Sequence, residues 1–173
     1  MTVSWIEWRR LRGANMLGFL ACAGLLGGAY YLEFVVGMEP CPLCILQRLA
    51  MFALGIVFLL AVVHGPRGRG RFGYAFLILL SAGTGAAIAV RHLWLQSLPP
   101  DQVPACGPGL DFMVEAFPLQ EVLMMVLEGS GECAEVETLF GVTLPGWTLA
   151  AFVIVGLYGF WVNVKPRERL IWA

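Results

Sequence analysis

Residues 42–63 read PLCILQRLAMFALGIVFLLAVV, an apolar run in which Arg48 is the only charged side chain. About 20 such residues in a helix cross the roughly 30 Å hydrocarbon core of a bilayer. Similar runs cover residues 14–36, 72–90 and 147–164. They are continuously apolar, whereas the strands of a membrane barrel alternate apolar and polar residues. The sequence therefore predicts an all-α membrane protein, a single domain (1–173) built as a bundle of four membrane-spanning helices.

The composition excludes several other classes of protein. Of the 173 residues, 59% are hydrophobic and only 13% are charged, about half the charged share of a soluble domain. Intrinsic disorder requires low hydrophobicity, and a nucleic-acid binder requires a basic patch. The net charge of −1 gives no sign of one, so no nucleic-acid partner is predicted and the membrane lipid is the expected surrounding.

The basic residues predict how the bundle is oriented. Nine of the eleven lie in three short segments before the first run, between the second and third, and after the fourth: Arg9, Arg10, Arg12; Arg67, Arg69, Arg71; Lys165, Arg167, Arg169. Cytoplasmic segments near membrane spans carry an excess of Lys and Arg. We therefore expect both termini and the 64–71 loop in the cytoplasm, with loops 37–41 and 91–146 on the opposite face.

Two further patterns concern the helices themselves. The N-terminal arginines and Ala21-Cys22-Ala23 resemble a cleavable signal peptide, but the apolar run continues to Val36 and is too long for one. Small residues at spacings that allow close helix packing in lipid predict a tight bundle. They are Gly24 and Gly28, Ser81 and Gly85, and Gly156.

Four of the five cysteines fall on the predicted outer face: Cys41, Cys44, Cys106 and Cys133. An even set of four outward cysteines is typical of an oxidising compartment. Together with the cytoplasmic arginines, this favours a bacterial inner membrane with the cysteines on the periplasmic side. Cys22 lies in mid-span, about 15 Å from that face, and is expected to be a small buried residue.

Cys41-Pro42-Leu43-Cys44 stands where the chain re-enters the membrane. Pro42 suits the first turn of a helix, which puts Cys41 at the helix N-terminus. The unpaired N–H groups and helix dipole there stabilise an anion, and the thiolate is the form of cysteine that exchanges disulfides. A C-x-x-C pair at this place indicates redox cycling.

The second pair, Cys106 and Cys133, leaves more than one interpretation open. A zinc site built only from cysteines usually combines two close pairs, and these two cysteines are far apart in the chain, so we predict no metal. A structural disulfide between them and a catalytic one remain equally compatible with the sequence.

Two charged or polar residues near the outer face are candidates for binding an electron acceptor. Arg48 follows Cys44 by four residues and so shares its helix face. Its charge could snorkel to the headgroups, or stabilise a thiolate and negative charge on an acceptor oxygen. His92, at a similar depth, is either interfacial or a hydrogen-bond or proton donor to the same ligand.

These features resemble the DsbB family of membrane quinone reductases, which reoxidise the periplasmic thiol oxidase DsbA. The resemblance rests on the four spans, the C-P-L-C-I-L-Q-R run at 41–48 and the two cysteines of the long outer loop. Cys133-Ala134-Glu135 and Leu144-Pro145-Gly146-Trp147 also look like the family.

The resemblance implies an electron relay. The partner's thiolate would attack Cys106, Cys133 would complete the second pair, and the resulting dithiol would be reoxidised by the Cys41–Cys44 disulfide. Cys44 would meet a quinone, ubiquinone or menaquinone, near Arg48 and His92. The residues themselves predict a short helix at 118–127, too short to cross a bilayer and suited to the membrane interface, with one apolar stripe formed by Leu119, Val122, Leu123 and Val126.

Alternatives remain for the function. One is a DsbI-like variant dedicated to a different DsbA-like partner, and another is a non-catalytic scaffold stapled by disulfides. The vitamin K epoxide reductase-like group is disfavoured, because its C-x-x-C lies near the start of the last span.

Overall fold

The computed structural model describes residues 5–66, 68–99, 101–104, 110–129, 131–134, 136 and 138–165. Four long helices form the body of the molecule: α1 (Trp5–Tyr31), α2 (Pro42–His64), α3 (Gly70–Gln96) and α6 (Leu144–Val164). Each contains a stretch long and apolar enough to cross a membrane. The prediction of an all-α protein with a four-helix membrane bundle is confirmed. α3 continues through Arg91 and His92, six residues beyond the predicted run that ended at residue 90.

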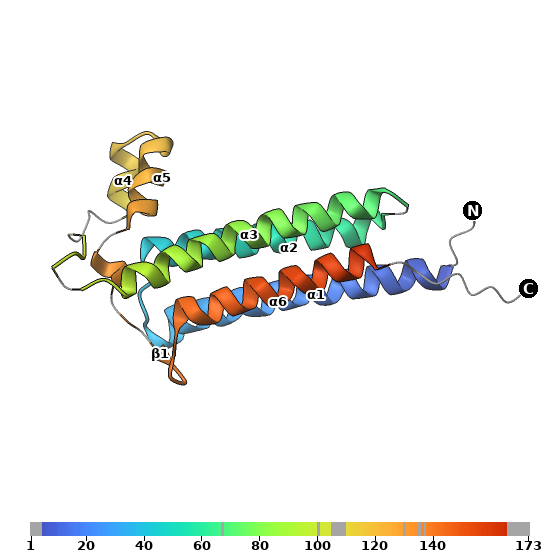
Figure 1. Ribbon diagram of the computed structural model, residues 1–173, viewed down its shortest axis with the longest axis horizontal. Helices are drawn as coiled ribbons and strands as arrows, with labels where there is room; N and C mark the ends of the chain where they lie inside the picture. The colour runs from blue at the N-terminus through green and yellow to red at the C-terminus, as the bar shows by residue number, and fades with distance from the viewer. Residues whose placement is uncertain are drawn as a thin grey trace, which may run out of the picture.

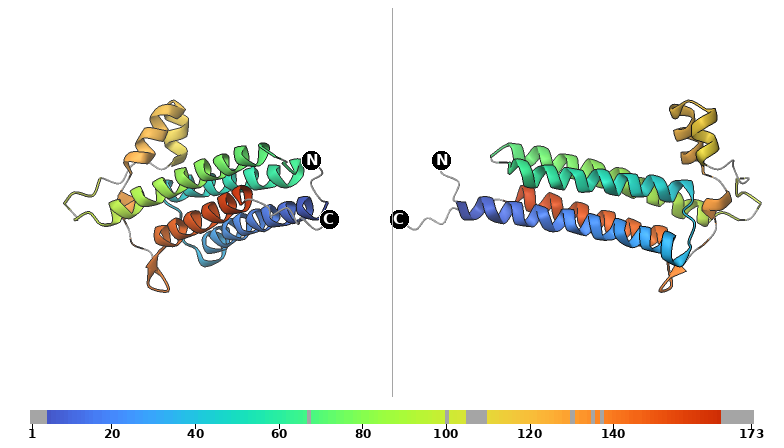
Figure 2. Two further views of the ribbon diagram at one scale, coloured as in Figure 1. Left: turned by 45° about the vertical axis from the view of Figure 1, so that its right-hand side comes forward. Right: turned by 180° about the vertical axis from the view of Figure 1, so that it is seen from behind.

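Shorter elements are confined to one end of the bundle. The π-helical segment η1 (Leu32–Val36) extends α1, and the outer loop carries α4 (Leu110–Ala116), α5 (Leu119–Glu128), the 3₁₀ turn η2 (Gly131–Ala134) and a small antiparallel hairpin of β1 (Thr138–Leu139) and β2 (Val142–Thr143). Figures 1 and 2 show α4 and α5 projecting to the side of the bundle at the end opposite the two chain termini.

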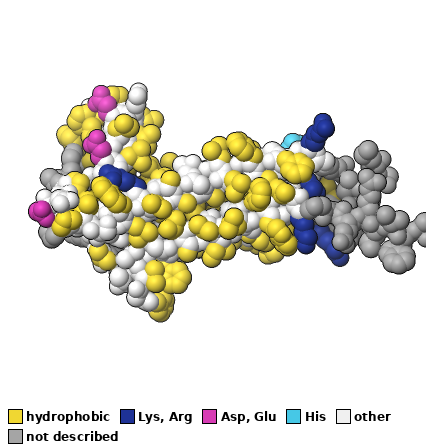
Figure 3. Space-filling model, viewed as in Figure 1, with side chains coloured by type: hydrophobic (Ala, Val, Ile, Leu, Met, Phe, Trp, Pro, Cys, Tyr) yellow, Lys and Arg dark blue, Asp and Glu magenta, His cyan; other side chains and the backbone are white. Residues whose placement is uncertain are grey.

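The charges separate along the bundle as the sequence suggests. Figure 3 shows most of the basic side chains at the end near the termini, the acidic side chains together with one basic group at the end with α4 and α5, and hydrophobic side chains over the length between them. Exposed apolar residues such as Leu17, Phe76 and Ile154 cover the outside of the helices. This surface suits a lipid surrounding, because water would penalise so much exposed apolar area.

The middle of the bundle is packed around two phenylalanines. Phe58 of α2 and Phe152 of α6 are buried together with Leu54, Ile78 and Cys22. Burial of Cys22 in this core agrees with the prediction that it is a small packing residue.

Glycine allows close helix approach at two of the predicted positions. A Cβ at Gly85 would collide with the ring of Phe152, and a Cβ at Gly156 would lie 2.7 Å from the Cβ of Ala82. α3 and α6 therefore touch where small residues permit it. Gly24 and Gly28 differ from the prediction, because a Cβ at either one would meet nothing within 4 Å.

A second core cluster binds the outer loop to the bundle. Val122 and Val126 of α5 and Met113 of α4 pack against Leu43 of α2 and Leu95 of α3. The predicted helix at 118–127 is present as α5, but its apolar stripe is divided: Val122 and Val126 face protein, whereas Leu119 and Leu123 are exposed.

Arg91 of α3 binds the C-terminal end of α5. Its guanidinium donates hydrogen bonds to the carbonyl oxygens of Leu127 (3.1 Å) and Glu128 (2.9 Å) and stacks over Trp94. The last carbonyls of a helix lack partners within the helix and carry its negative dipole end, so a cation stabilises them. The outer loop is thus tied to the long helices by apolar packing and by one cation.

Candidate redox site

The first pair of cysteines is built by the start of α2. Cys41 is the N-terminal cap residue of this helix, with extended backbone angles (φ −67°, ψ 163°), and Pro42 occupies the first turn. The backbone N–H of Cys44 donates to the Cys41 sulfur over 3.4 Å. The predicted position at a helix N-terminus is therefore the one observed, and a free N–H group stabilises negative charge on this sulfur.

The two sulfurs lie next to each other and are partly exposed. Cys41 Sγ and Cys44 Sγ are 3.2 Å apart, a contact between two thiols. A small side-chain rotation brings them to bonding distance, because C-x-x-C at a helix start holds both sulfurs on one side. The pair is therefore placed to alternate between dithiol and disulfide.

His92 of α3 lies against both sulfurs. Its Nε2 is 3.8 Å from Cys41 Sγ, and its Nδ1 is 4.0 Å from Cys44 Sγ. The ring is 3% exposed. His92 is therefore buried against the cysteines, and its predicted role as a donor to the electron acceptor stays a prediction.

Cys133 of η2 joins this group from the outer loop. It is fully buried in the cluster formed by α2, α3 and α5, and Cys41 packs against the same cluster. Its backbone hydrogen-bonds the His92 ring, and its sulfur is close enough to Cys44 for an electrostatic interaction. Cys106, the other cysteine of the predicted second pair, lies outside the described residues.

Arg48 lies on the helix face that the sequence predicts, and the structure places Glu33 next to it. Arg48 shares the face of Cys44 and interacts with it electrostatically. Its guanidinium forms an ion pair with Glu33 of η1, donates to the carbonyl oxygen of Ala29 over 3.4 Å and lies over the Tyr30 ring. The charge is therefore held by α1 and η1, and snorkelling alone does not account for its position.

Sequence reasoning missed three polar residues of this site: Glu33, Gln47 and Thr148. Gln47 is 3% exposed and reaches His92, and Thr148 of α6 hydrogen-bonds Gln47. A signal existed for Gln47, because a neutral polar residue one helical turn from Cys44 in an apolar run needs a buried partner. No comparable signal marked Glu33 or Thr148, whose partners are distant in the chain.

The donor atoms of Cys41, Cys44 and His92 lie within 4.8 Å of one another. Two sulfurs and an imidazole at this spacing are donors that a soft cation prefers. Absence of a metal at this site therefore stays a prediction.

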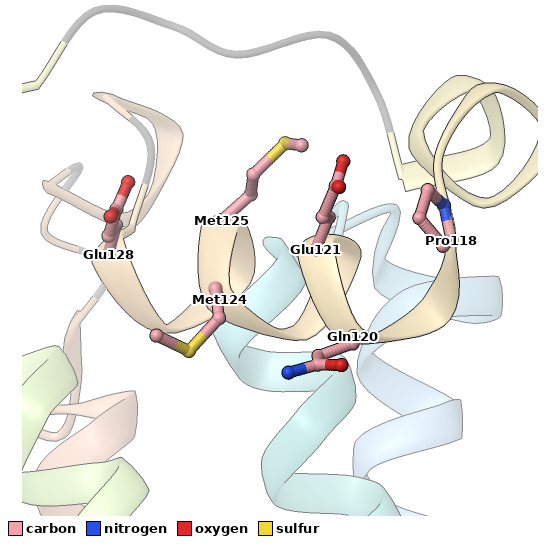
Figure 4. Close-up of a pocket in the computed structure, with 6 residues that line it drawn as sticks. All are labelled: Pro118, Gln120, Glu121, Met124, Met125 and Glu128. Atoms are coloured by element: carbon pink, nitrogen blue, oxygen red, sulfur yellow. The ribbon is translucent and has the colours of Figure 1, made fainter.

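A hollow in the outer loop lies apart from this group. It is lined by Pro118, Gln120, Glu121, Met124, Met125 and Glu128. Figure 4 shows Gln120 and Met124 projecting to one side of α5 and Glu121 and Met125 to the other. Its lining contains no cysteine or histidine, so it is not part of the redox group.

The fold and the site together define a multi-pass membrane protein with a pair of thiols at the start of one long helix, beside a buried histidine. The family model of Disulfide bond formation protein DsbB matches residues 11–162. The chain belongs to this family, and it is a membrane oxidoreductase of disulfide bond formation.

Individual relatives match most of the chain. The Disulfide bond formation protein B of Hahella chejuensis is 54% identical over 163 residues, covering 92% of this chain and 98% of the relative. That of Marinobacter nauticus is 52% identical, with 89% and 94% covered. Disulfide bond formation protein B 1 of Pseudomonas aeruginosa is 50% identical, with 80% and 85% covered.

Proposed function

We propose that the protein reoxidises a periplasmic DsbA-like dithiol oxidase and passes the two electrons to a membrane quinone. The observation that carries this proposal is the burial of Cys133 in the same apolar cluster against which Cys41 packs, next to His92. A cysteine of the outer loop and the helix-capping pair thus share one end of the bundle, and disulfide exchange between them requires their sulfurs to come into direct contact.

The relay proceeds through two cysteine pairs. The partner's two thiols are oxidised by the Cys106–Cys133 disulfide, which becomes a dithiol. That dithiol is oxidised in turn by the Cys41–Cys44 disulfide, leaving Cys41 and Cys44 reduced. Each exchange forms one disulfide and breaks one, so two electrons and two protons move toward the membrane at every step.

A quinone completes the balance by taking up two electrons and two protons as hydroquinone while the Cys41–Cys44 disulfide forms again. The residues that fit it lie on one face of α2. The sulfur of Cys44 and the guanidinium of Arg48 are both partly exposed and one turn apart. Arg48 is a donor suited to an acceptor oxygen that gains negative charge.

The proposed orientation puts this site on the periplasmic face of a bacterial inner membrane. Its support is the separation of basic and acidic side chains to opposite ends of the bundle (Figure 3). In reduced spheroplasts, a variant retaining only Cys41 should react with a membrane-impermeant maleimide. Labelling only after the membrane is broken would reverse the orientation.

We also propose that α5 lies in the membrane interface. Leu119 (79% exposed), Leu123 and Met124 form an unburied apolar surface on a helix too short to cross a bilayer. A nitroxide at Leu119→Cys, in a chain whose native cysteines are replaced by serine, should be more accessible to oxygen than to a water-soluble relaxant.

The deciding experiment combines the purified protein in proteoliposomes, a reduced DsbA-like oxidase and ubiquinone or menaquinone. Quinone absorbance should fall with wild-type protein and with Cys22→Ser, and should not change with Cys44→Ser. Because both variants exchange one thiol for a hydroxyl, the comparison isolates the site. Quinone reduction by Cys44→Ser, or none by wild type, would refute the proposal.

A further inference from the structure

A chain of polar side chains extends from α6 to the redox cysteines. Thr148 of α6 donates a hydrogen bond to Oε1 of Gln47 in α2. Nε2 of Gln47 lies 3.1 Å from Nδ1 of His92 in α3, and the other ring nitrogen of His92 faces Cys41 Sγ at 3.8 Å. Three helices therefore contribute to one connected path that ends at a reactive sulfur.

The direction of these hydrogen bonds follows from the chemistry of each group. An amide nitrogen donates and does not accept, so Nδ1 of His92 must be the acceptor in its contact with Gln47. A neutral imidazole carries a single proton, which is then on Nε2. Nε2 is the nitrogen nearest Cys41, so its N–H can be directed at that sulfur, with the Cys133 backbone as a further partner of the ring.

The hydroxyl of Thr148 contacts the amide of Gln47 and can select which way that amide points. Its hydroxyl has one hydrogen and two acceptors in reach, Gln47 Oε1 and the carbonyl oxygen of Pro145 at 3.0 Å. If the hydrogen went to Pro145, the Thr148 oxygen would accept from the amide nitrogen. Gln47 Oε1 would then face His92 and require the proton on Nδ1, leaving Nε2 without one.

We propose that Gln47 and Thr148 are positioning residues that hold His92 with its proton on Nε2, directed at the Cys41 sulfur. This inference rests on the proposed function, in which Cys41 is repeatedly released from a disulfide. A hydrogen bond from a neutral N–H stabilises the Cys41 thiolate, and such charge-assisted bonds are stronger than neutral ones. The proton stays on the ring, so no group is transferred in this step.

Burial makes the arrangement effective. Gln47 and His92 are each 3% exposed, so water does not compete for their hydrogen bonds, and an unpaired polar atom there would be costly. In this tautomer Nδ1 has a single lone pair, which the Gln47 amide occupies at 3.1 Å, so the Cys44 sulfur at 4.0 Å is a neighbour of the ring and not its hydrogen-bond donor. His92 thus presents its donor to Cys41 and not to Cys44.

Nitrogen NMR of the histidine rings tests the proposal directly. The chain has two histidines, and His64, which bonds Tyr74 near the other end of the bundle, is assigned with a His64→Asn variant. In reduced full-length protein labelled with ¹⁵N-histidine, His92 should be protonated at Nε2. A proton on Nδ1 in the wild type would overturn the proposal.

Three variants locate the cause of that tautomer. Gln47→Leu removes the donor to Nδ1 and Thr148→Val releases the amide, so each should give a mixture of tautomers or the Nδ1–H form. Thr148→Ser keeps the hydroxyl and should keep the wild-type spectrum. An unchanged His92 spectrum in Thr148→Val would refute the role of Thr148, even if Gln47→Leu failed to fold.

Activity is a second readout. Loss of one hydrogen bond to the ring should slow quinone-dependent turnover by about tenfold in Gln47→Leu, with Thr148→Ser close to wild type. The two proposals fail separately. A wild-type protein that reduces no quinone refutes the proposed function, whereas normal turnover with His92 protonated on Nδ1 refutes only the tautomer.

Discussion

Arg48 of α2 forms an ion pair with Glu33, which lies in the π-helical segment at the end of α1. This contact joins the first two long helices at the redox end of the bundle. It also gives Arg48 a fixed position beside the exposed face of Cys44. A charge at this depth is normally held by a partner, and Glu33 is that partner.

Replacing Glu33 measures what the ion pair contributes to stability. Glu33→Gln should lower the free energy of unfolding by about 1 kcal/mol or less, because both side chains are partly exposed to solvent and screened. Reversible unfolding in mixed micelles measures it, with exposed Glu39→Gln as the matched control. In a double-mutant cycle with Arg48→Gln, zero coupling energy would contradict the pairing.

Arg48→His tests the role of the guanidinium toward the electron acceptor. The smaller imidazole cannot keep a permanent positive charge at the same place, so the apparent KM for quinone should rise several-fold. Oxidation of Cys41 and Cys44 by a chemical disulfide should remain at the wild-type rate. An unchanged KM would mean that the arginine serves only the contact with Glu33.

Cys106→Ala tests the order of the relay. Without this thiol, turnover with a reduced DsbA-like oxidase should be abolished, because the partner has lost its point of attack. Dithiothreitol, which reduces the Cys41–Cys44 pair directly, should still drive quinone reduction. Normal turnover with the protein partner would refute the assigned order.

Arg91→Ala should loosen the outer loop. Without its hydrogen bonds to Leu127 and Glu128, backbone amides of α5 should exchange hydrogen several-fold faster, because opening of this segment becomes easier. Arg71, which donates to the carbonyl oxygens of Val164 and Lys165 at the other end, is the matched control. Arg71→Ala should leave α5 unchanged; equal exchange in both variants would contradict the role of Arg91.

A buried amide pair offers a test of packing away from the redox site. Asn163 donates to Asn15 over 3.0 Å, and both side chains are fully buried between α1 and α6. Asn15→Leu should lower the free energy of unfolding by about 0.6 kcal/mol and by at most about 1.7 kcal/mol, the average and the maximum for interhelical hydrogen bonds in a bilayer. Thr84→Val, which removes a bond within α3 to Leu80, should cost less. An equal loss would contradict an interhelical contribution.

Much of the fold was predictable because a membrane-spanning helix is marked by a continuous apolar run in its own sequence. Continuous apolar runs identified the four long helices, and Pro42 with Cys41 identified the start of α2. Which apolar side chains of α5 are buried against the bundle, and which are exposed, was not predictable. Leu119 and Val122 are equally apolar, and only the position of Leu43 and Leu95 decides which of them is buried.

The candidate site, too, was predictable only in part. The sequence by itself determined that Cys41 caps a helix beside Cys44 and that Arg48 shares their face, because those relations depend on spacings of three and four residues. Only the tertiary structure decided that His92, Cys133, Thr148 and Glu33 lie around them. These contacts join segments far apart in the chain, and they depend on how four helices rotate and pack, which no local pattern specifies.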